Sequence, residues 1–391
     1  MTNNTPRLMV AIGQLDRGGT EQHLCQVLPA LARSGWRITV FVLRRGGALS
    51  ETLTSAGVTV TGPDLPCDGL RSTVRAAIQL RALAHRERPD VVHFFLPPAY
   101  LLGATATLGM RIRRVMSRRS LATYQRRYFG VRTLEWWLHR RMDIVLANSL
   151  AVAAELSREG VPPERLGLLY NGVDVPERPT LRSDARTRLE LGSDILVMVC
   201  VANLIAYKGH AVLLEALSRI RDRLPADWVV LMVGRDSGIG GALRAQSHDL
   251  DLEHHVRWVG GVPDVGDYLA AADIGVLASH EEGFSNAVLE SMAAGLPMVV
   301  TDVGGNAEAV VDGRCGRVVP SANPGALAAA LLELSVSPDL RRTWGDSARS
   351  RVLQSFNLSR CVALYRQLYE NLAAGVPQPL PRDARVEPAG H

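Results

Sequence analysis

Short apolar runs, rich in valine, isoleucine and leucine, alternate with helix-length segments along most of the chain. Near-continuous apolar runs of this length are typical of strands covered by helices on both faces, as the strands of parallel sheets are. The runs lie at 8–12, 37–43, 89–95, 143–147, 196–201, 228–233, 256–258, 274–278 and 298–301. The sequence therefore predicts an α/β fold with parallel sheets.

The chain has 391 residues, which is long enough for two domains of ordinary size. Predicted strands lie on both sides of the stretch NGVDVPERPT, whose prolines favour a linker. We therefore predict two Rossmann-like domains, over 1–170 and 171–355, whose parallel sheets face a cleft between the domains. A helix over 356–374 is expected to pack back toward the first domain. The proline-rich segment 375–391 is expected to be disordered.

The composition indicates a folded protein, with 47% hydrophobic and 21% charged residues. Five cysteines are scattered without a CxxC pair, which predicts reduced thiols rather than a disulfide framework or a zinc site. The apolar run at 8–12 is too short for the core of a signal peptide. The longest uncharged stretch, 91–110, contains His93 and two prolines, so we do not expect it to span a membrane. These features predict a cytoplasmic protein.

Positive charge is concentrated in one segment, from Arg111 to Arg141. This segment has ten arginines and a single acid, Glu135, and thus a charge of +9, whereas the whole chain carries +5. Aromatic residues are interleaved with the arginines: Tyr124, Tyr128, Phe129, Trp136 and Trp137. The combination predicts contact with anionic lipid headgroups or phosphates, and hence peripheral attachment to the inner face of a membrane. A solvated helix face is the alternative. No nucleic-acid-binding motif accompanies the segment, so we do not expect a nucleic-acid partner.

Three loops that follow predicted strands contain residues suited to an anion. GQLDRGGTE carries Gly18 and Gly19 before a helix, although it does not match GxGxxG. VANLIAYKGH places Lys208 just before a helix that begins near His210, where a cation suits a diphosphate. TDVGGNAEAV has another glycine pair. Each loop taken alone could be an ordinary turn or, for Lys208, a solvated side chain.

The stretch EEGFSNAVLESMAAGLP holds two carboxylates eight positions apart. We predict that Ser285 caps a helix over 286–294 that Gly295 ends. Glu282 then lies in the preceding loop, and Glu290 lies on a helix whose other residues are mostly apolar. A buried carboxylate requires hydrogen-bond donors, which the hydroxyls of a ribose would supply. The alternative is a glutamate on the polar side of the helix.

Together these motifs resemble the retaining glycosyltransferases of the GT-B type, family 4. The most specific match is EGFSNAVLE followed by SMAAGLPMVVTDVGG, and GGTEQHL, ANSLAVAAEL, LLYNGVD, VANLIAYKGH and LMVGRDSG occur in the expected order. The resemblance covers roughly residues 8–372. It implies a donor nucleotide sugar held mainly by the second domain, with the first domain on the acceptor side.

By this resemblance Glu290 binds the ribose hydroxyls, Glu282 the hydroxyls of the sugar ring, and Lys208 the diphosphate. Lys208 and Glu282 are thus candidate catalytic residues. The further donor-binding residues that the resemblance implies are Gly18, Gly19, Asn203, Gly234, Arg235, Val265, Gly283, Phe284, Ser285 and Asn286.

The sequence departs from the family pattern at two places. Asn203 stands where relatives often have a basic residue before the lysine, which leaves phosphate neutralisation to Lys208, to helix ends or to Arg235. Relatives often carry a histidine after a strand of the first domain. Here Arg118 and Arg119 fall in that region, and they are candidates for stabilising the charge of a leaving group or acceptor phosphate. His93, at the end of an earlier strand, is the other candidate, although a histidine in such a place is usually structural.

The resemblance implies a retaining transfer of a hexose from a nucleotide sugar to a glycan or lipid-linked acceptor in polysaccharide or glycolipid synthesis. UDP-sugars and GDP-sugars are the donors expected first. No D-x-D motif is present, so we expect no metal and no cofactor beyond the nucleotide sugar itself. Two alternatives stay open. One is a nucleotide-sugar epimerase of the same fold, and the other is a nucleotide-binding module without catalysis.

Overall fold

The structure, a computed structural model, describes residues 5–16, 18–63, 67, 69–121, 130–175, 180–225 and 227–376. The predicted linker prolines Pro176 and Pro179, the aromatic residues of 122–129 and most of the predicted tail lie outside these residues. Contacts divide the described chain into two units. The first runs to Gly172 and resumes at Leu358, and the second is Val173–Asn357.

The first unit is built on a seven-stranded sheet in the order β3-β2-β1-β4-β5-β6-β7. All of its neighbouring strands are parallel. Its strands are β1 (Arg7–Ile12), β2 (Arg37–Val42), β3 (Thr59–Thr61), β4 (Val91–Phe95), β5 (Arg113–Arg118), β6 (Ile144–Ala147) and β7 (Leu166–Leu168). Its helices are α1 (Gly19–Arg33), α2 (Ser50–Ser55), α3 (Leu70–Glu87), α4 (Pro97–Ala106), α5 (Val131–His139), α6 (Leu150–Arg158) and α15 (Leu358–Ala374), and a short 3-10 turn, Pro163–Arg165, precedes β7.

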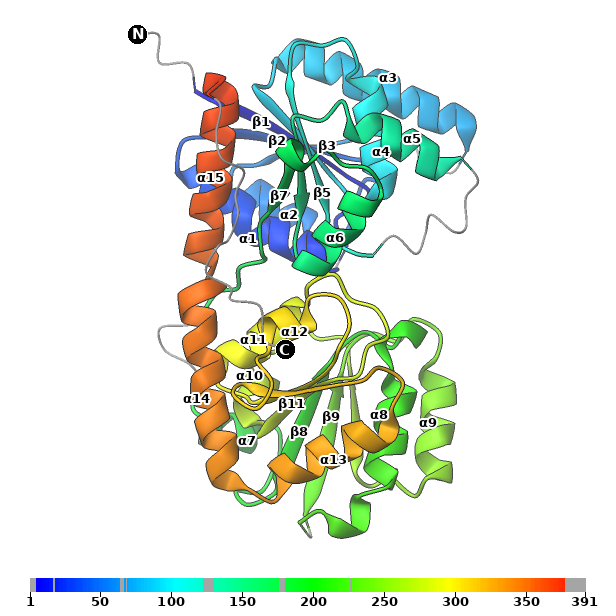
Figure 1. The fold of residues 1–391 in the computed structure, drawn as a ribbon, viewed down its shortest axis with the longest axis vertical. Helices are drawn as coiled ribbons and strands as arrows, with labels where there is room; N and C mark the ends of the chain where they lie inside the picture. The colour runs from blue at the N-terminus through cyan, green and yellow to red at the C-terminus, as the bar shows by residue number, and fades with distance from the viewer. Residues whose placement is uncertain are drawn as a thin grey trace. The chain divides into compact units, whose positions relative to one another are not determined.

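Helices cover both faces of the first sheet, as buried parallel strands require (Figure 1). Alternate residues of β1 show the two layers. Leu8, Val10 and Ile12 belong to a buried cluster shared with α1 and α15, whereas Met9 and Ala11 belong to one shared with α3, α4 and α6. The helix α15 follows the second unit in the chain but packs on α1 and belongs to the first unit.

The second unit is built on a six-stranded parallel sheet in the order β10-β9-β8-β11-β12-β13. Its strands are β8 (Leu196–Val201), β9 (Trp228–Val233), β10 (Val256–Gly260), β11 (Ile274–Leu277), β12 (Met298–Thr301) and β13 (Gly316–Val319). Its helices are α7 (Arg182–Arg188), α8 (His210–Ser218), α9 (Gly240–Asp249), α10 (Gly266–Ala271), α11 (Asn286–Ala293), α12 (Asn306–Ala309), α13 (Pro324–Ser335) and α14 (Pro338–Ser355), with 3-10 turns at Ala206–Lys208 and Arg221–Arg223. The predicted α/β class with two parallel sheets is confirmed.

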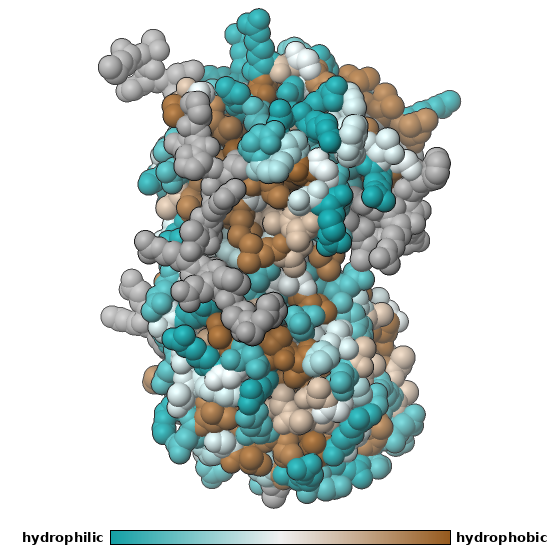
Figure 2. Space-filling model, viewed as in Figure 1, coloured by the Kyte–Doolittle hydropathy of each residue, from teal (hydrophilic) through white to brown (hydrophobic). Residues whose placement is uncertain are grey.

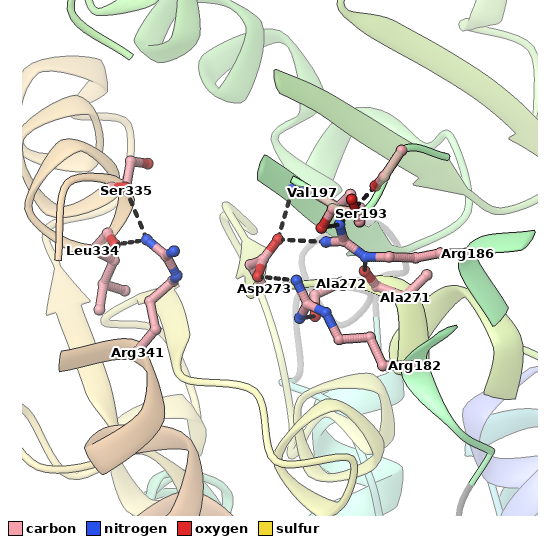
Figure 3. A network of polar contacts seen from close by, with 11 residues as sticks. Arg182, Arg186, Ser193, Val197, Ala271, Ala272, Asp273, Leu334, Ser335 and Arg341 are labelled. Carbon is pink, nitrogen blue, oxygen red and sulfur yellow. Dashed lines mark hydrogen bonds and ion pairs between the residues drawn. The ribbon is translucent and has the colours of Figure 1, made fainter. Parts of the chain in front are cut away.

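An ion-pair network fixes the amino-terminal edge of this second sheet (Figure 3). Asp273, just before β11, accepts hydrogen bonds from the backbone amide of Val197 at 2.8 Å, from Arg186 at 2.9 Å and from Arg182 at 2.6 Å. Arg186 is buried, and its other hydrogen bonds go to backbone carbonyls. The charges of Asp273, Arg182 and Arg186 are all hydrogen-bonded within the network. The network therefore stabilises the junction of β8 and β11 rather than forming a ligand site.

The predicted bounds of β8, β9 and β12 are confirmed, but four strands were missed: β3, β5, β7 and β13. The error at β5 changes the interpretation of the basic segment 111–141. Residues 115–119 of that segment are buried, so Arg118 and Arg119 do not belong to an exposed basic surface. The five cysteines are free thiols, and none of the described helices is both long and apolar enough to cross a membrane.

Candidate functional site

The loop after β8 presents Lys208, which is the only lysine of the chain, since the other 43 of its 44 Lys and Arg residues are arginine. Lys208 ends a 3-10 turn, and Gly209 after it has φ of 69°. A Cβ on Gly209 would collide with the carbonyl of Ala278 at the end of β11, so the close approach of the two loops requires glycine. The amide of His280 donates to the carbonyl of Tyr207 at 2.7 Å and joins the loops a second time.

Lys208 and Glu282 form an ion pair across these loops. The distance from Nζ of Lys208 to Oε1 of Glu282 is 2.6 Å, and the hydroxyl of Ser279 donates to the same oxygen at 2.7 Å. The side chains of Lys208 and Glu282 are 18% and 9% exposed. Such a partly buried pair, supported by a second hydrogen bond from Ser279, holds both groups in a defined position.

Glycines in the loop after β12 support Glu282 from the other side. Gly304 has φ of 53°, and a Cβ there would collide with the carbonyl of Glu282. The amide of Gly305 donates to the carbonyl of Gly283 at 2.9 Å. Contact between two backbones leaves no room for side chains, which is why this loop pair is rich in glycine.

The helix α11 begins at Asn286, as predicted, and ends at Ala293, one residue before the predicted end. The hydroxyl of Ser285 accepts from the amide of Val288 at 3.4 Å, and Gly295 ends the helix with φ of 84°. Phe284, just before the cap, is buried, and its ring lies 5.3 Å from that of Phe356. Asn286 is half-buried in the first turn.

Glu290 lies on α11 with its carboxylate largely withdrawn from solvent. No hydrogen bond to that carboxylate is present within the part of the chain that the structure describes. Burial, together with the negative charge of Asp264, raises the pKa of Glu290 to about 7. A buried carboxylate without donors is a group that a ligand bearing hydroxyls would stabilise.

Asn203 and Arg235 are joined through the backbone. The side-chain oxygen of Asn203 accepts from the amide of Arg235 at 3.0 Å, and the amide of Leu204 donates to the carbonyl of Arg235 at 2.8 Å. A Cβ on Gly234 would collide with the carbonyl of Ala202. Asn203 therefore braces the loop after β9, and the exposed side chain of Arg235 starts from that braced backbone.

The predicted donor residues of the second unit thus follow the carboxyl ends of the neighbouring strands β10, β9, β8 and β11. Val265 comes just before α10, beside the acid Asp264 that raises the pKa of Glu290. The structure brings Lys208 into contact with Glu282. Among the described residues no cluster of three or more histidine, cysteine and acidic side chains has the spacing of a metal site.

Gly18 and Gly19 lie in the first unit, at the start of α1. A Cβ on Gly18 would collide with the carboxylate of Glu21, which is nearly buried. Burial raises the pKa of Glu21, although a backbone hydrogen bond and Arg119 act in the opposite direction. The motif GGTEQHL contained Glu21, but only its glycines were singled out.

Arg118 is buried in a network of its own. Its guanidinium pairs with Glu135 at 3.3 Å and Glu159 at 3.1 Å, and Glu159 also lies 3.3 Å from Nε2 of His139. Burial alone would raise the pKa of Glu159, but hydrogen bonds from His139 and Arg118 lower it below its usual value. The network accounts for the charge of Arg118 without any ligand, so a structural role fits it better than the predicted catalytic one.

Arg119 lies among different residues, at the end of β5. It donates to the side-chain oxygen of Asn171 at 2.6 Å. Burial and the charge of Arg119 lower the pKa values of both His23 and His93 well below the usual range, so both rings are neutral. Both ring nitrogens of His23 lack a hydrogen-bond partner among the described residues.

His93 is enclosed in the core of the first unit. Its Nδ1 lies 2.7 Å from the hydroxyl of Tyr369, on α15, and its Nε2 lies 2.8 Å from the hydroxyl of Ser117. Both nitrogens are thus occupied, which agrees with the structural interpretation of a histidine at a strand end. Asn171 lies in the motif LLYNGVD but was not singled out, and Tyr369 was not expected to contact His93, because the two are 276 positions apart.

Family models match both units. Residues 17–177 match "Glycosyltransferase Family 4", and residues 196–336 match "Glycosyl transferases group 1". The chain is similar to the D-inositol 3-phosphate glycosyltransferase of Streptomyces scabiei, with 29% identity over 91% of this chain and 87% of that protein. It is also similar to D-inositol 3-phosphate glycosyltransferase 2 of Catenulispora acidiphila, with 35% identity over 53% of this chain and 51% of that protein.

Solved structures share the fold. Anabaena HepE in complex with UDP-glucose matches with a TM-score of 0.82 and 22% identity, over 94% of this chain and 99% of that chain. Sucrose-phosphate synthase from Thermosynechococcus elongatus also matches with a TM-score of 0.82 and 22% identity, over 95% of this chain and 100% of that chain. At this identity the likeness establishes the fold.

Proposed function

The chain belongs to the group 1 glycosyltransferases of family 4, which have the GT-B fold, and we propose that it transfers a hexose from a UDP-sugar to an acceptor that carries a phosphate. UDP is the first choice of nucleotide because HepE was solved with UDP-glucose, and GDP is the second. The acceptor is a lipid-linked or phosphorylated glycan or polyol, in line with the D-inositol 3-phosphate that the relatives' names give.

The observation that carries this proposal is the pairing of Lys208 with Glu282. Eight positions further along the chain, the carboxylate of Glu290 has no hydrogen-bond partner among the described residues. An ammonium has three donors, and Glu282 takes one of them. The other two are free for diphosphate oxygens, and the second oxygen of Glu282 is free for a sugar hydroxyl. Glu290 would accept hydrogen bonds from the ribose.

The chemical step breaks the bond between the anomeric carbon and the leaving phosphate oxygen and forms a bond from that carbon to the acceptor oxygen. Lys208 and backbone amides stabilise the negative charge that develops on the diphosphate. The departing phosphate takes the acceptor's proton, so the new bond forms on the same face and the configuration is retained. Neither a protein nucleophile nor a metal is required for this route. Full activity after treatment with EDTA is the expected result, and its loss would contradict the metal-free route.

Nucleotide binding tests the donor site directly. The melting temperature is measured with UDP, GDP and ADP, for the native protein, Glu290→Ala and the control Glu281→Ala. A ligand at one hundred times its Kd stabilises the folded state by about 2.7 kcal/mol. One nucleotide should raise the melting temperature of the native protein and the control but not that of Glu290→Ala. No shift with any nucleotide at millimolar concentration would refute the donor site.

Product analysis tests the reaction. Proton NMR of the purified product reports the anomeric configuration, which should match that of the donor. The acceptor panel contains D-inositol 3-phosphate, a polyprenyl-phosphate-linked sugar and their phosphate-free counterparts, and transfer should require the phosphate. A new sugar epimer in the absence of any acceptor would instead identify an epimerase.

Arg119 is the proposed contact for the acceptor phosphate, since it is the arginine of the pair whose partner is a neutral amide rather than a carboxylate. We place the reaction in the cytoplasm, with the protein attached peripherally to the membrane. The exposed arginines of 111–141 contribute to that attachment.

A further inference from the structure

One face of α3 exposes large apolar side chains at regular spacing. Leu70, Val74 and Ile78 follow one another every four residues and are 82%, 50% and 63% exposed. This spacing aligns them along one side of the helix. The opposite side of α3 is the buried one, with Ala76 and Leu80 in the core of the first unit. Figure 2 shows hydrophobic surface beside hydrophilic surface where Figure 1 places α3.

The same exposed face is strongly basic. Four arginines of α3 are exposed: Arg71, Arg75, Arg81 and Arg86. The only acid in the helix, Glu87, is half-buried; it accepts a hydrogen bond from Thr39 at 2.7 Å and lies 3.5 Å from Arg86, which leaves Arg71, Arg75 and Arg81 without an acid in the helix. An exposed apolar stripe flanked by arginines alone is typical of a helix that lies in the interface of an anionic membrane.

A cavity of about 1100 Å³ adjoins the carboxyl end of α3. Its lining includes His85 of α3 and four exposed arginines, Arg88, Arg111, Arg113 and Arg141. Three acids also line it, Asp90, Asp143 and the exposed Glu164, against six arginines, so arginines outnumber acids two to one. Asp143 pairs with Arg113 at 3.0 Å and accepts from the amide of Arg114 at 2.7 Å, and Asp90 accepts from the amide of Arg7 at 2.8 Å.

Arg88 and Arg111 have no ion pair among the described residues. The cavity therefore retains positive charge at the carboxyl end of the helix that carries the apolar stripe, at the amino-terminal edge of the sheet, where β4 and β5 begin. A phosphate group would be a suitable occupant, because guanidinium groups bind phosphate oxygens in pairs.

A second helix of the first unit adds to the pattern. On α5, Leu134 and Trp136 are exposed, and the guanidinium of Arg140 stacks over the ring of Trp136 at 3.7 Å. The helix α4 contacts both α3 and α5, so all three belong to one layer of the unit (Figure 1). Tryptophan beside arginine is favoured at the level of lipid headgroups.

We propose that the exposed face of α3 docks on an anionic phospholipid bilayer, with the arginine-lined cavity at its carboxyl end holding a lipid phosphate. The apolar stripe enters the interface, and the arginines reach the headgroups around it. A second copy of this chain is disfavoured as the occupant, since two faces bearing only positive charge repel one another. The inference extends the peripheral attachment in the proposed function and assigns it to a surface other than the segment 111–141 alone.

Vesicle flotation of the full chain tests the proposal. Native protein should float with vesicles of phosphatidylglycerol and phosphatidylcholine at low salt, and far less with pure phosphatidylcholine or in high salt. Three variants each remove one element: Leu70→Ser/Val74→Ser/Ile78→Ser, Arg71→Gln/Arg75→Gln and Arg88→Gln/Arg111→Gln. The matched control is Leu181→Ser/Leu353→Ser, at exposed leucines of the second unit.

Each variant of the first unit should lower the vesicle partition coefficient about tenfold or more, whereas the control should leave it unchanged. Equal flotation of the native protein and the three variants would overturn the proposal, as would failure of the native protein to float at low salt. If α3 were instead a dimer interface, sedimentation velocity would show a dimer that the serine variant abolishes. If the protein bound inorganic phosphate at millimolar concentration but did not float with vesicles, the cavity would be a site for free phosphate.

Donor binding separates this inference from the proposed function. The altered residues lie in the first unit, whereas Lys208 and Glu290 belong to the second, so nucleotide should still raise the melting temperature of every variant. Loss of flotation with donor binding intact would support the docking face even if the proposed acceptor were wrong.

Discussion

Lys208 and Glu282 are 74 positions apart in the chain, yet their side chains meet at 2.6 Å where two strands of the second sheet end. Each group limits the position of the other, because the hydroxyl of Ser279 and the backbone around Gly304 hold Glu282 in place. A donor whose diphosphate contacts Lys208 and whose sugar contacts Glu282 would therefore meet a preformed site.

Removal of either Lys208 or Glu282 should impair transfer by more than the loss of that residue's own contact with the donor, because the remaining partner loses its ion pair as well. Lys208→Ala loses the charge on the diphosphate and also leaves Glu282 with one hydrogen bond, and we expect kcat/KM to fall 10²- to 10³-fold. Glu282→Gln should lower kcat/KM by about tenfold or more. The double variant measures the coupling, which should be about 1–3 kcal/mol. Strictly additive effects would show that the ion pair does not act in the reaction.

Ser279 should position Glu282 without contacting the substrate. Ser279→Ala removes the 2.7 Å hydrogen bond to Oε1, so we expect the transfer rate to fall about tenfold while the Kd for the free nucleoside diphosphate stays the same. The control is Ser321→Ala. The hydroxyl of Ser321 donates to the carbonyl of Ser279 at 3.4 Å and does not touch Glu282. Equal losses in both variants would indicate a general loss of structure.

Glu290 should make stability depend on pH. Its pKa is raised from 4.5 to about 7 in the folded protein, so the unfolded chain releases this proton first as the pH rises. The stabilisation is complete below about pH 4.5 and is lost as the pH rises toward 7, by on the order of 2–3 kcal/mol. Glu290→Gln should lack this component.

The measurement is urea unfolding of both proteins from pH 5 to pH 8. The difference between them removes the contribution of other titrating groups, including the buried histidines. A difference in unfolding free energy that does not change with pH would contradict the raised pKa.

Arg118 should matter for stability. Arg118→Gln leaves Glu135 and Glu159 buried beside a neutral side chain, which we expect to cost about 3–5 kcal/mol of unfolding free energy. Arg113→Gln breaks an exposed pair with Asp143 and should cost less than about 1 kcal/mol. Denaturant titration checks both values, and equal small costs would argue against the buried network.

Lys208 offers a chemical probe, because it is the only lysine side chain. An amine-reactive reagent such as pyridoxal 5'-phosphate with borohydride should modify the protein at this side chain and at the terminal amine, and peptide mass spectrometry separates the two. Saturating nucleotide should protect Lys208 and leave the terminal amine reactive. If Lys208 were labelled equally with and without saturating nucleotide, the diphosphate would have to bind elsewhere.

Much of the second unit was predictable because its strands are short, apolar and separated by clear caps. Ser285 and Gly295 bracket α11 with side-chain and backbone preferences that act locally, so its start was predicted correctly and its end to within one residue. The strand β13 was missed because its half-buried positions, including Arg317, do not form an apolar run.

The first unit was harder to predict from sequence. The strand β5 has the residues RRVMSR, and its arginines were taken for surface charge. Arg118 is buried only because Glu135 and Glu159 lie opposite it, and no local pattern encodes that pairing. The surroundings of His93 depend in the same way on a tyrosine that is 276 positions away.

That tyrosine has a consequence for biosynthesis. Tyr369 and the rest of α15 leave the ribosome only after the entire second unit, yet α15 packs on α1 and closes the core around β1 and β4. The unit made first is therefore completed last, and nascent chains must keep the apolar face beneath α15 uncovered, or held by a chaperone, until translation reaches the helix. A chain that ended just before Leu358 would have a complete second unit attached to an unfinished first one.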